Sequence, residues 1–177
     1  MLVQLTSKEG GAIDSLNHGL VTIPEVEYSA HTHRAYMVSK LWTDVANGAN
    51  RILRCNIPKS YAEPHLIISV NGEGAWHLKI FENIMAHGGT MEIARDMFRC
   101  NPVDLRNVVY SDGSVDSYGT KIYECLVGGG FGTISGGNSI LSNLHFCGGK
   151  KYLIRMGNAS GAAADCSINV ICLDHTI

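Results

Sequence analysis

The chain has 177 residues, of which 45% are hydrophobic and 17% charged, and its 14 basic and 16 acidic residues give a net charge of −2. This length suits one domain, and the charge balance argues against nucleic acid as a partner, because proteins that bind it carry a basic surface. No apolar run reaches the ~20 residues that span a bilayer, so we expect no membrane partner. The first residues lack the basic and apolar regions of a signal peptide, which predicts synthesis in a reducing cytoplasm.

The first 30 residues differ from the rest of the chain. Their apolar side chains, among them Leu5, Leu16, Leu20 and Ile23, follow no sustained period, and glycines and a proline interrupt them. Such a segment is typical of an arm that orders on a larger surface. We therefore predict an irregular N-terminal arm over residues 1–30 and a single domain over residues 31–177.

Strand-like alternation begins near residue 34. Both faces of the segment 34–43 are mostly apolar, which predicts a strand covered by layers on both sides. A turn at Ala46-Asn47-Gly48 leads into a second strand, which Pro58 ends.

The next two strands surround the turn sequence Asn71–Gly74. Leu66, Ile68 and Val70 alternate before it and Trp76, Leu78 and Ile80 after it, which predicts a hairpin with both apolar sets facing the core. We expect both tryptophans, Trp42 and Trp76, to lie in that core.

The segment 90–107 fits either a short amphipathic helix or a loop, because Met91, Ala94, Met97 and Phe98 lie near helical spacing. Further strands are expected at 121–127, 151–158 and 166–173, the last two joined as a hairpin by a turn at 158–161. Seven to eight short strands of this kind predict an all-β fold, an antiparallel β-sandwich of the jelly-roll type. Its two long connections would span 85–118 and 128–150.

The six cysteines form no CxxC motif. Disulfides are rare in a reducing compartment, so we expect most of the six to be buried free thiols. The even spacing of Cys166 and Cys172 places both on one face of a strand, and the sequence leaves open whether they oxidise.

The search for catalytic chemistry gives little. His31 and His33 would share a strand face, but no acidic residue follows them at ligand spacing, so we predict an interface position and no metal site. The chain lacks GxSxG, and its glycine-rich segment lacks the lysine of a phosphate-binding loop. We therefore predict no enzyme and no cofactor.

The order of features from residue 31 to residue 175 is similar to a pattern in small structural proteins of tailed-bacteriophage heads. The first part of the pattern matches His33, Ala35, Tyr36, Val38, Ser39, Val45, Ala46, Asn47, Gly48, Ile57 and Pro58. The later part matches His65, Phe81, Glu82, Tyr152, Leu153, Arg155, Asn158, Ser160 and Gly161. The chain departs from the pattern at Arg95 and Arg99 and in its number of cysteines.

This resemblance implies a jelly-roll decoration or cement protein on the outer surface of the capsid. Its partners would be the major capsid protein and further copies of itself, as a homotrimer, and it would be made in the host cytoplasm and reside in the virion. We predict that the capsid or subunit contact includes Leu5, Leu16, Leu20, Ile23, His31 and His33. The alternatives are a carbohydrate-binding module or fibre-like adhesin and, less favoured, a metal enzyme of the cupin type.

Overall fold

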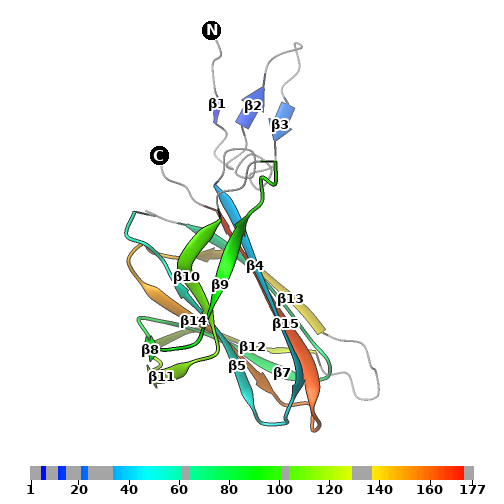
Figure 1. The fold of residues 1–177 in the computed structure, drawn as a ribbon. Helices are drawn as coiled ribbons and strands as arrows, with labels where there is room; N and C mark the ends of the chain where they lie inside the picture. Colours follow the sequence, from blue (N-terminus) through cyan, green and yellow to red (C-terminus); the bar gives the residue numbers. More distant parts are fainter. Residues whose placement is uncertain are drawn as a thin grey trace.

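A computed structural model describes residues 5–6, 12–14, 21–23, 34–60, 64–100, 104–128 and 137–173. All regular secondary structure within these residues is β-strand, and the strands form three sheets (Figure 1). The all-β prediction is confirmed.

The smallest strands lie in the predicted arm. They are β1 (Leu5–Thr6), β2 (Ala12–Asp14) and β3 (Val21–Ile23), which form an antiparallel sheet in the order β1-β2-β3. The described parts of the arm are therefore regular, and none of their described pairings joins them to the rest of the chain.

The main sheet has ten strands in the order β12-β7-β14-β5-β10-β9-β4-β15-β6-β13. Their bounds are β4 (Ala35–Val45), β5 (Asn50–Asn56), β6 (His65–Gly72), β7 (Trp76–Glu82), β9 (Thr90–Asp96), β10 (Leu105–Ser111), β12 (Thr120–Val127), β13 (Gly137–His145), β14 (Lys151–Asn158) and β15 (Ala164–Leu173). The sheet folds over so that its edge strands, β12 and β13, come into contact. A separate two-stranded ribbon pairs β8 (Met85–His87) with β11 (Ser114–Ser117).

The strand order is that of a jelly roll. One half of the sheet holds β4-β15-β6-β13 and the other holds β5-β14-β7-β12, and the hairpin β9–β10 connects the two halves on one side. The chain changes halves at each step from β4 to β7 and again at each step from β12 to β15. The predicted sandwich of the jelly-roll type is confirmed.

The core lies between the two halves. The inward residues of β6 (Leu66, Ile68 and Val70) and of β7 (Trp76, Leu78 and Ile80) are at most 1% exposed, and Trp42 is also buried. The predicted inward faces and both core tryptophans are confirmed.

The two predicted hairpins are wrong. The strands before and after Asn71–Gly74 belong to opposite halves, as do β14 and β15, so each turn crosses the sandwich instead of pairing its strands. Alternation shows which face of a strand is buried but not which strand lies beside it. At the first of these corners the ring of Trp76 packs on Gly72, where a Cβ atom would lie 2.4 Å from the indole.

The predicted helix or loop at 90–107 is also wrong, because this segment contains β9 and the start of β10. Pairing of β9 with β4 and β10 outweighs the local helical spacing. The two long connections contain strands as well: 85–118 holds β8 to β11 and 128–150 holds β13.

Two expectations about burial fail. The outward face of β4 is open, with Met37 41% and Leu41 61% exposed, so this strand is covered on one side only along that stretch. Of the cysteines, Cys55 and Cys166 are buried. Cys125 and Cys172 are half-buried, and Cys100 and Cys147 are exposed. None of these six cysteines forms a disulfide, but most of them are not buried.

Candidate functional site

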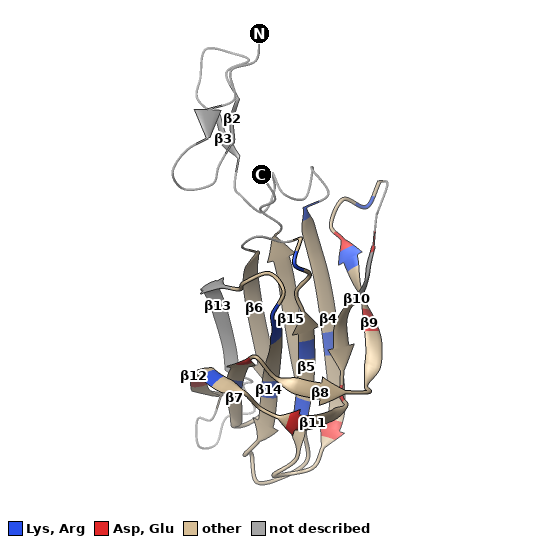
Figure 2. Ribbon diagram, turned by 90° about the vertical axis from the view of Figure 1, so that its left-hand side faces the viewer, with Lys and Arg blue, Asp and Glu red and all other residues tan. Residues whose placement is uncertain are grey.

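The outer faces of the two sheet halves differ in what covers them. Over β5, β14 and β7 the ribbon β8–β11 crosses the outside of the sheet (Figure 2). A second apolar cluster lies beneath it, made of Ile52, Phe81, Ile84 and Leu153 with Ala86 and Val115 packed against it. This half therefore has part of its outer face closed by its own chain.

Two arginines support the covered face. The guanidinium of Arg155 lies 5.9 Å from the ring centre of Phe81 and 5.3 Å from that of Tyr118. Arg54 lies 4.4 Å from the ring centre of Tyr110, and its Nη2 donates to the carbonyl of Gly88 at 3.2 Å. Arginine stacked in this way contributes packing as well as charge, so both side chains help to hold the ribbon in place.

The outer face of β4, β15 and β6 is the candidate site, and we call it the open face. Strand register arranges its outward residues in three rows of three. From one end these rows are Met37–Ile171–Ile67, Ser39–Asn169–Ser69 and Leu41–Ser167–Asn71. All nine are uncharged, and none is fully buried.

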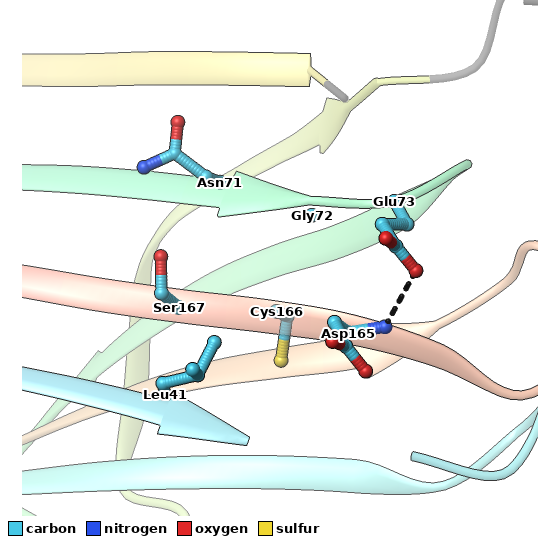
Figure 3. Close-up of a pocket in the computed structure, with 7 residues that line it drawn as sticks. All are labelled: Leu41, Asn71, Gly72, Glu73, Asp165, Cys166 and Ser167. Carbon is cyan, nitrogen blue, oxygen red and sulfur yellow. Dashed lines mark hydrogen bonds between the residues drawn. The ribbon is translucent and has the colours of Figure 1, made fainter. Parts of the chain in front are cut away.

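The open face ends in a shallow depression of about 200 Å³ (Figure 3). Leu41, Asn71 and Ser167 reach it from three neighbouring strands, and Glu73 and Asp165 line its outer end. The backbone N–H of Asp165 donates to Oε2 of Glu73 at 3.2 Å, and that of Asp44 donates to Oδ1 of Asp165 at 2.8 Å. Three carboxylates thus mark this end of the open face.

The opposite end carries arginines. Arg95 of β9 lies beside Met37 of β4, and its Nη1 bonds Oδ2 of Asp104 at 2.5 Å. Nη1 of Arg99 lies 3.3 Å from the other oxygen of the same carboxylate. The hydrogen bond from Arg95 to Asp104 is the main reason that the pKa of the Asp104 carboxyl lies below its usual value. Both arginines therefore share the half-buried carboxylate of Asp104 at this end.

The corners beneath the depression are held by a buried amide. Asn158 is 4% exposed, and its Nδ2 donates to the carbonyls of Val45 at 2.7 Å and Ala162 at 2.8 Å. Its Oδ1 accepts from the N–H of Ser160 at 2.8 Å. One side chain therefore joins the β4–β5 corner to the β14–β15 corner and fixes the end of the open face.

Most of the residues predicted as capsid or subunit contacts lie outside the residues that the structure describes. Leu5 lies in β1, where it pairs with Ile13, and Ile23 lies in β3, where it pairs with Ala12. Leu16, Leu20, His31 and His33 lie outside the described residues. The predicted contact set stays a prediction.

The open face was missed by sequence reasoning. The only signal was the apolar residues in outward positions of β4, and these were interpreted as buried. Among the described residues, no three His, Cys, Asp or Glu side chains gather as a metal site, and no helix is long and apolar enough to cross a membrane. No protein-family model and no curated protein sequence matches this chain.

Proposed function

We propose that this protein is a virion structural protein that binds the outer surface of a tailed-phage head and stabilises it. The observation that supports this most is the open face: an uncharged sheet surface with exposed Met37 and Leu41, on a jelly roll whose other outer face is partly covered by its own ribbon. Exposed apolar patches of this kind mark interaction surfaces. The resemblance of residues 31–175 to head proteins indicates the class of partner, the major capsid protein.

A cement protein works by adding many weak and repeated contacts, and the described residues suit this task. Hydrogen bonds such as those of Asn158 tie the corners of the sandwich to one another, which favours a stiff body. A stiff body loses little conformational entropy when it binds, so more of the contact energy is left to stabilise the shell.

The test is binding to phage heads that lack the protein. Purified protein is mixed with such heads, and the amount that sediments with them is measured against concentration. The proposal expects saturable binding at a fixed ratio to the major capsid protein, and a higher temperature of head disruption. Unsaturable or absent binding would contradict it.

The predicted role of the arm is tested in the same assay with Leu16→Ser and Leu20→Ser in the full chain. If the arm carries part of the attachment, this double variant saturates the heads at a higher concentration than the unchanged protein. Unchanged binding would remove the arm from the contact.

The depression at the end of the open face favours a second candidate, a carbohydrate-binding module. Asn71, Ser167, Glu73 and Asp165 supply polar groups there and Leu41 an apolar contact, the combination that sugar rings need. Binding of defined glycans that Asn71→Ala abolishes, without any binding to heads, would favour this function over the first.

A further inference from the structure

We propose that Asn47 is a site of spontaneous covalent modification, where the side-chain amide is lost as ammonia in the folded protein and aspartate or isoaspartate forms. The reaction consumes only water. The inference concerns the chemistry of one corner of the sandwich, and it holds whether or not the partner of the open face is a phage head.

The sequence supplies the reactive pair of residues. Asn-Gly occurs twice in the chain, at Asn47-Gly48 and at Asn71-Gly72. In such a pair the backbone nitrogen of the glycine attacks Cγ of the asparagine, a C–N bond forms, and the side-chain nitrogen leaves as ammonia with the proton of the glycine N–H. Glycine favours this ring closure because it has no Cβ atom. Water then opens the resulting succinimide at either carbonyl, which gives aspartate or isoaspartate.

The turn that contains Asn47 is open to this reaction. Asn47 and Gly48 are both exposed and connect β4 to β5, in a turn closed by a hydrogen bond from the N–H of Ala49 to the carbonyl of Ala46 at 3.0 Å. Gly48 has a φ of 79°, and outside its chain neighbours no atom lies within 4 Å of the position that its Cβ would take. The pair is therefore uncrowded, and water has access to a succinimide formed there.

Two hydrogen bonds restrain the pair in the folded protein. The N–H of Gly48 donates to the carbonyl of Asn158 at 2.9 Å, and Oδ1 of Asn47 accepts from the N–H of Gly161 at 3.0 Å. Both bonds have to open before the nitrogen attacks the side chain. Loss of two such bonds is expected to slow the reaction about 10- to 100-fold relative to the unfolded chain.

The second Asn-Gly pair is protected far more strongly. Asn71 and Gly72 lie within β6, which pairs with β13 on one side and with β15 on the other. Gly72 is buried, and the ring of Trp76 lies 2.4 Å from the position of its Cβ. Attack at this pair requires the sheet itself to open, so the same dipeptide serves as a control within one molecule.

The modification changes the charge and the backbone of the corner. Either product adds a carboxylate three residues after Asp44, at the end of the open face that Glu73 and Asp165 already mark. Isoaspartate also lengthens the backbone of the turn by one methylene group, which moves Gly48 relative to its acceptor on Asn158. We therefore expect the modified protein to be more acidic and its corner to be more weakly tied.

The first test follows both pairs by peptide mapping with mass spectrometry while the full chain is kept in mildly alkaline buffer, once folded and once in urea. In urea the two pairs should react at similar rates, because no structure restrains either. In the folded protein Asn47 should react at least about tenfold faster than Asn71, since one corner opens more readily than the sheet. Asn47→Gln should lose the signal of the modified peptide and so confirms its assignment.

Two outcomes of this test would overturn the proposal. One is a rate at Asn71 that equals or exceeds the rate at Asn47 in the folded protein. The other is an unmodified Asn47 after about 100 half-lives of the unfolded chain, because two exposed hydrogen bonds do not protect to that extent.

The second test loosens the corner. The side chain of Asn158 ties the two corners together, and its backbone carbonyl holds the N–H of Gly48. In Asn158→Ala the rate at Asn47 should therefore rise several-fold more than the rate at Asn71, which reports opening of the sheet. An equal rise at both pairs, or no rise at Asn47, would overturn the local opening on which the proposal depends.

Discussion

The buried amide of Asn158 gives the sharpest prediction about stability. In Asn158→Ala the carbonyls of Val45 and Ala162 each lose the amide donor, although the hydroxyl of Ser160 still donates to Ala162 at 2.9 Å, and the N–H of Ser160 loses its acceptor. The carbonyl of Val45 bonds to Asn158 in a buried setting, and an unsatisfied buried group costs about 1–3 kcal/mol. The other two groups are partly accessible to water and add about 0.5–1.5 kcal/mol each. We therefore expect a loss of about 3 kcal/mol in the free energy of unfolding.

The assay is urea unfolding followed by tryptophan fluorescence, with the slope compared between variants to confirm that only stability changed. Asn47→Ala is the matched control, because Oδ1 of Asn47 accepts a single exposed hydrogen bond from Gly161 at 3.0 Å. It should cost less than about 1 kcal/mol. Equal effects of the two substitutions, or less than about 1 kcal/mol for Asn158→Ala, would refute the role given to this amide.

The remaining predictions concern one corner, one ion cluster and the thiols. Gly72→Ala should destabilise the fold by about 1–3 kcal/mol, because the new Cβ would meet the fully buried ring of Trp76 at 2.4 Å. Gly157→Ala should cost less, since its Cβ would meet only a side-chain oxygen at 2.9 Å. Urea unfolding compares the two variants, and a reversed order of stability would contradict this packing. Hydrogen bonds from two lysines lower the pKa of Glu124 from 4.5 to about 2, so its contribution to stability is present above pH 4.5 and is lost as the pH falls toward 2. The stability difference between the unchanged protein and Glu124→Gln should therefore shrink over that range, and a difference that grows on acidification would show the opposite sign of coupling. In the folded protein a thiol reagent at pH 8 should react fast with the two exposed cysteines, Cys100 and Cys147. Fast reaction of a buried cysteine would disprove the burial described.

Burial explains why the two buried thiols, Cys55 and Cys166, should resist the reagent. It is the main cause that raises the pKa of Cys55 and of Cys166 to about 12, with Cys172 as a second cause for Cys55. Because the thiolate is the reactive form, these two should react only when the chain unfolds.

The faces of single strands could be predicted from sequence, but their neighbours could not. In β6 the alternation of Leu66, Ile68 and Val70 reflects one buried side, and a period of two residues shows this directly. One of its two partner strands is β15, which lies about 100 residues later, and the short turn after Gly72 gives no sign that it crosses the sandwich. Similarly, β9 was missed because its local spacing imitates a helix while its pairing is set by distant residues.

The candidate site was missed for a related reason. Phe81 and Leu41 are both apolar residues in outward strand positions, and nothing in their local sequence separates them. Phe81 is 8% exposed because the β8–β11 ribbon covers its face, whereas Leu41 is 61% exposed because no described segment covers it. Whether an outward face is covered depends on a segment elsewhere in the chain, so alternation alone does not identify an interaction surface.

The proposed role on the capsid is tested most directly by cryo-electron imaging of tailed-phage heads assembled with and without the gene for this chain. The proposal predicts density of the size and shape of this jelly roll at repeated positions outside the lattice of the major capsid protein, absent when the gene is deleted. Identical heads in the two samples, with no such density on either, would contradict it.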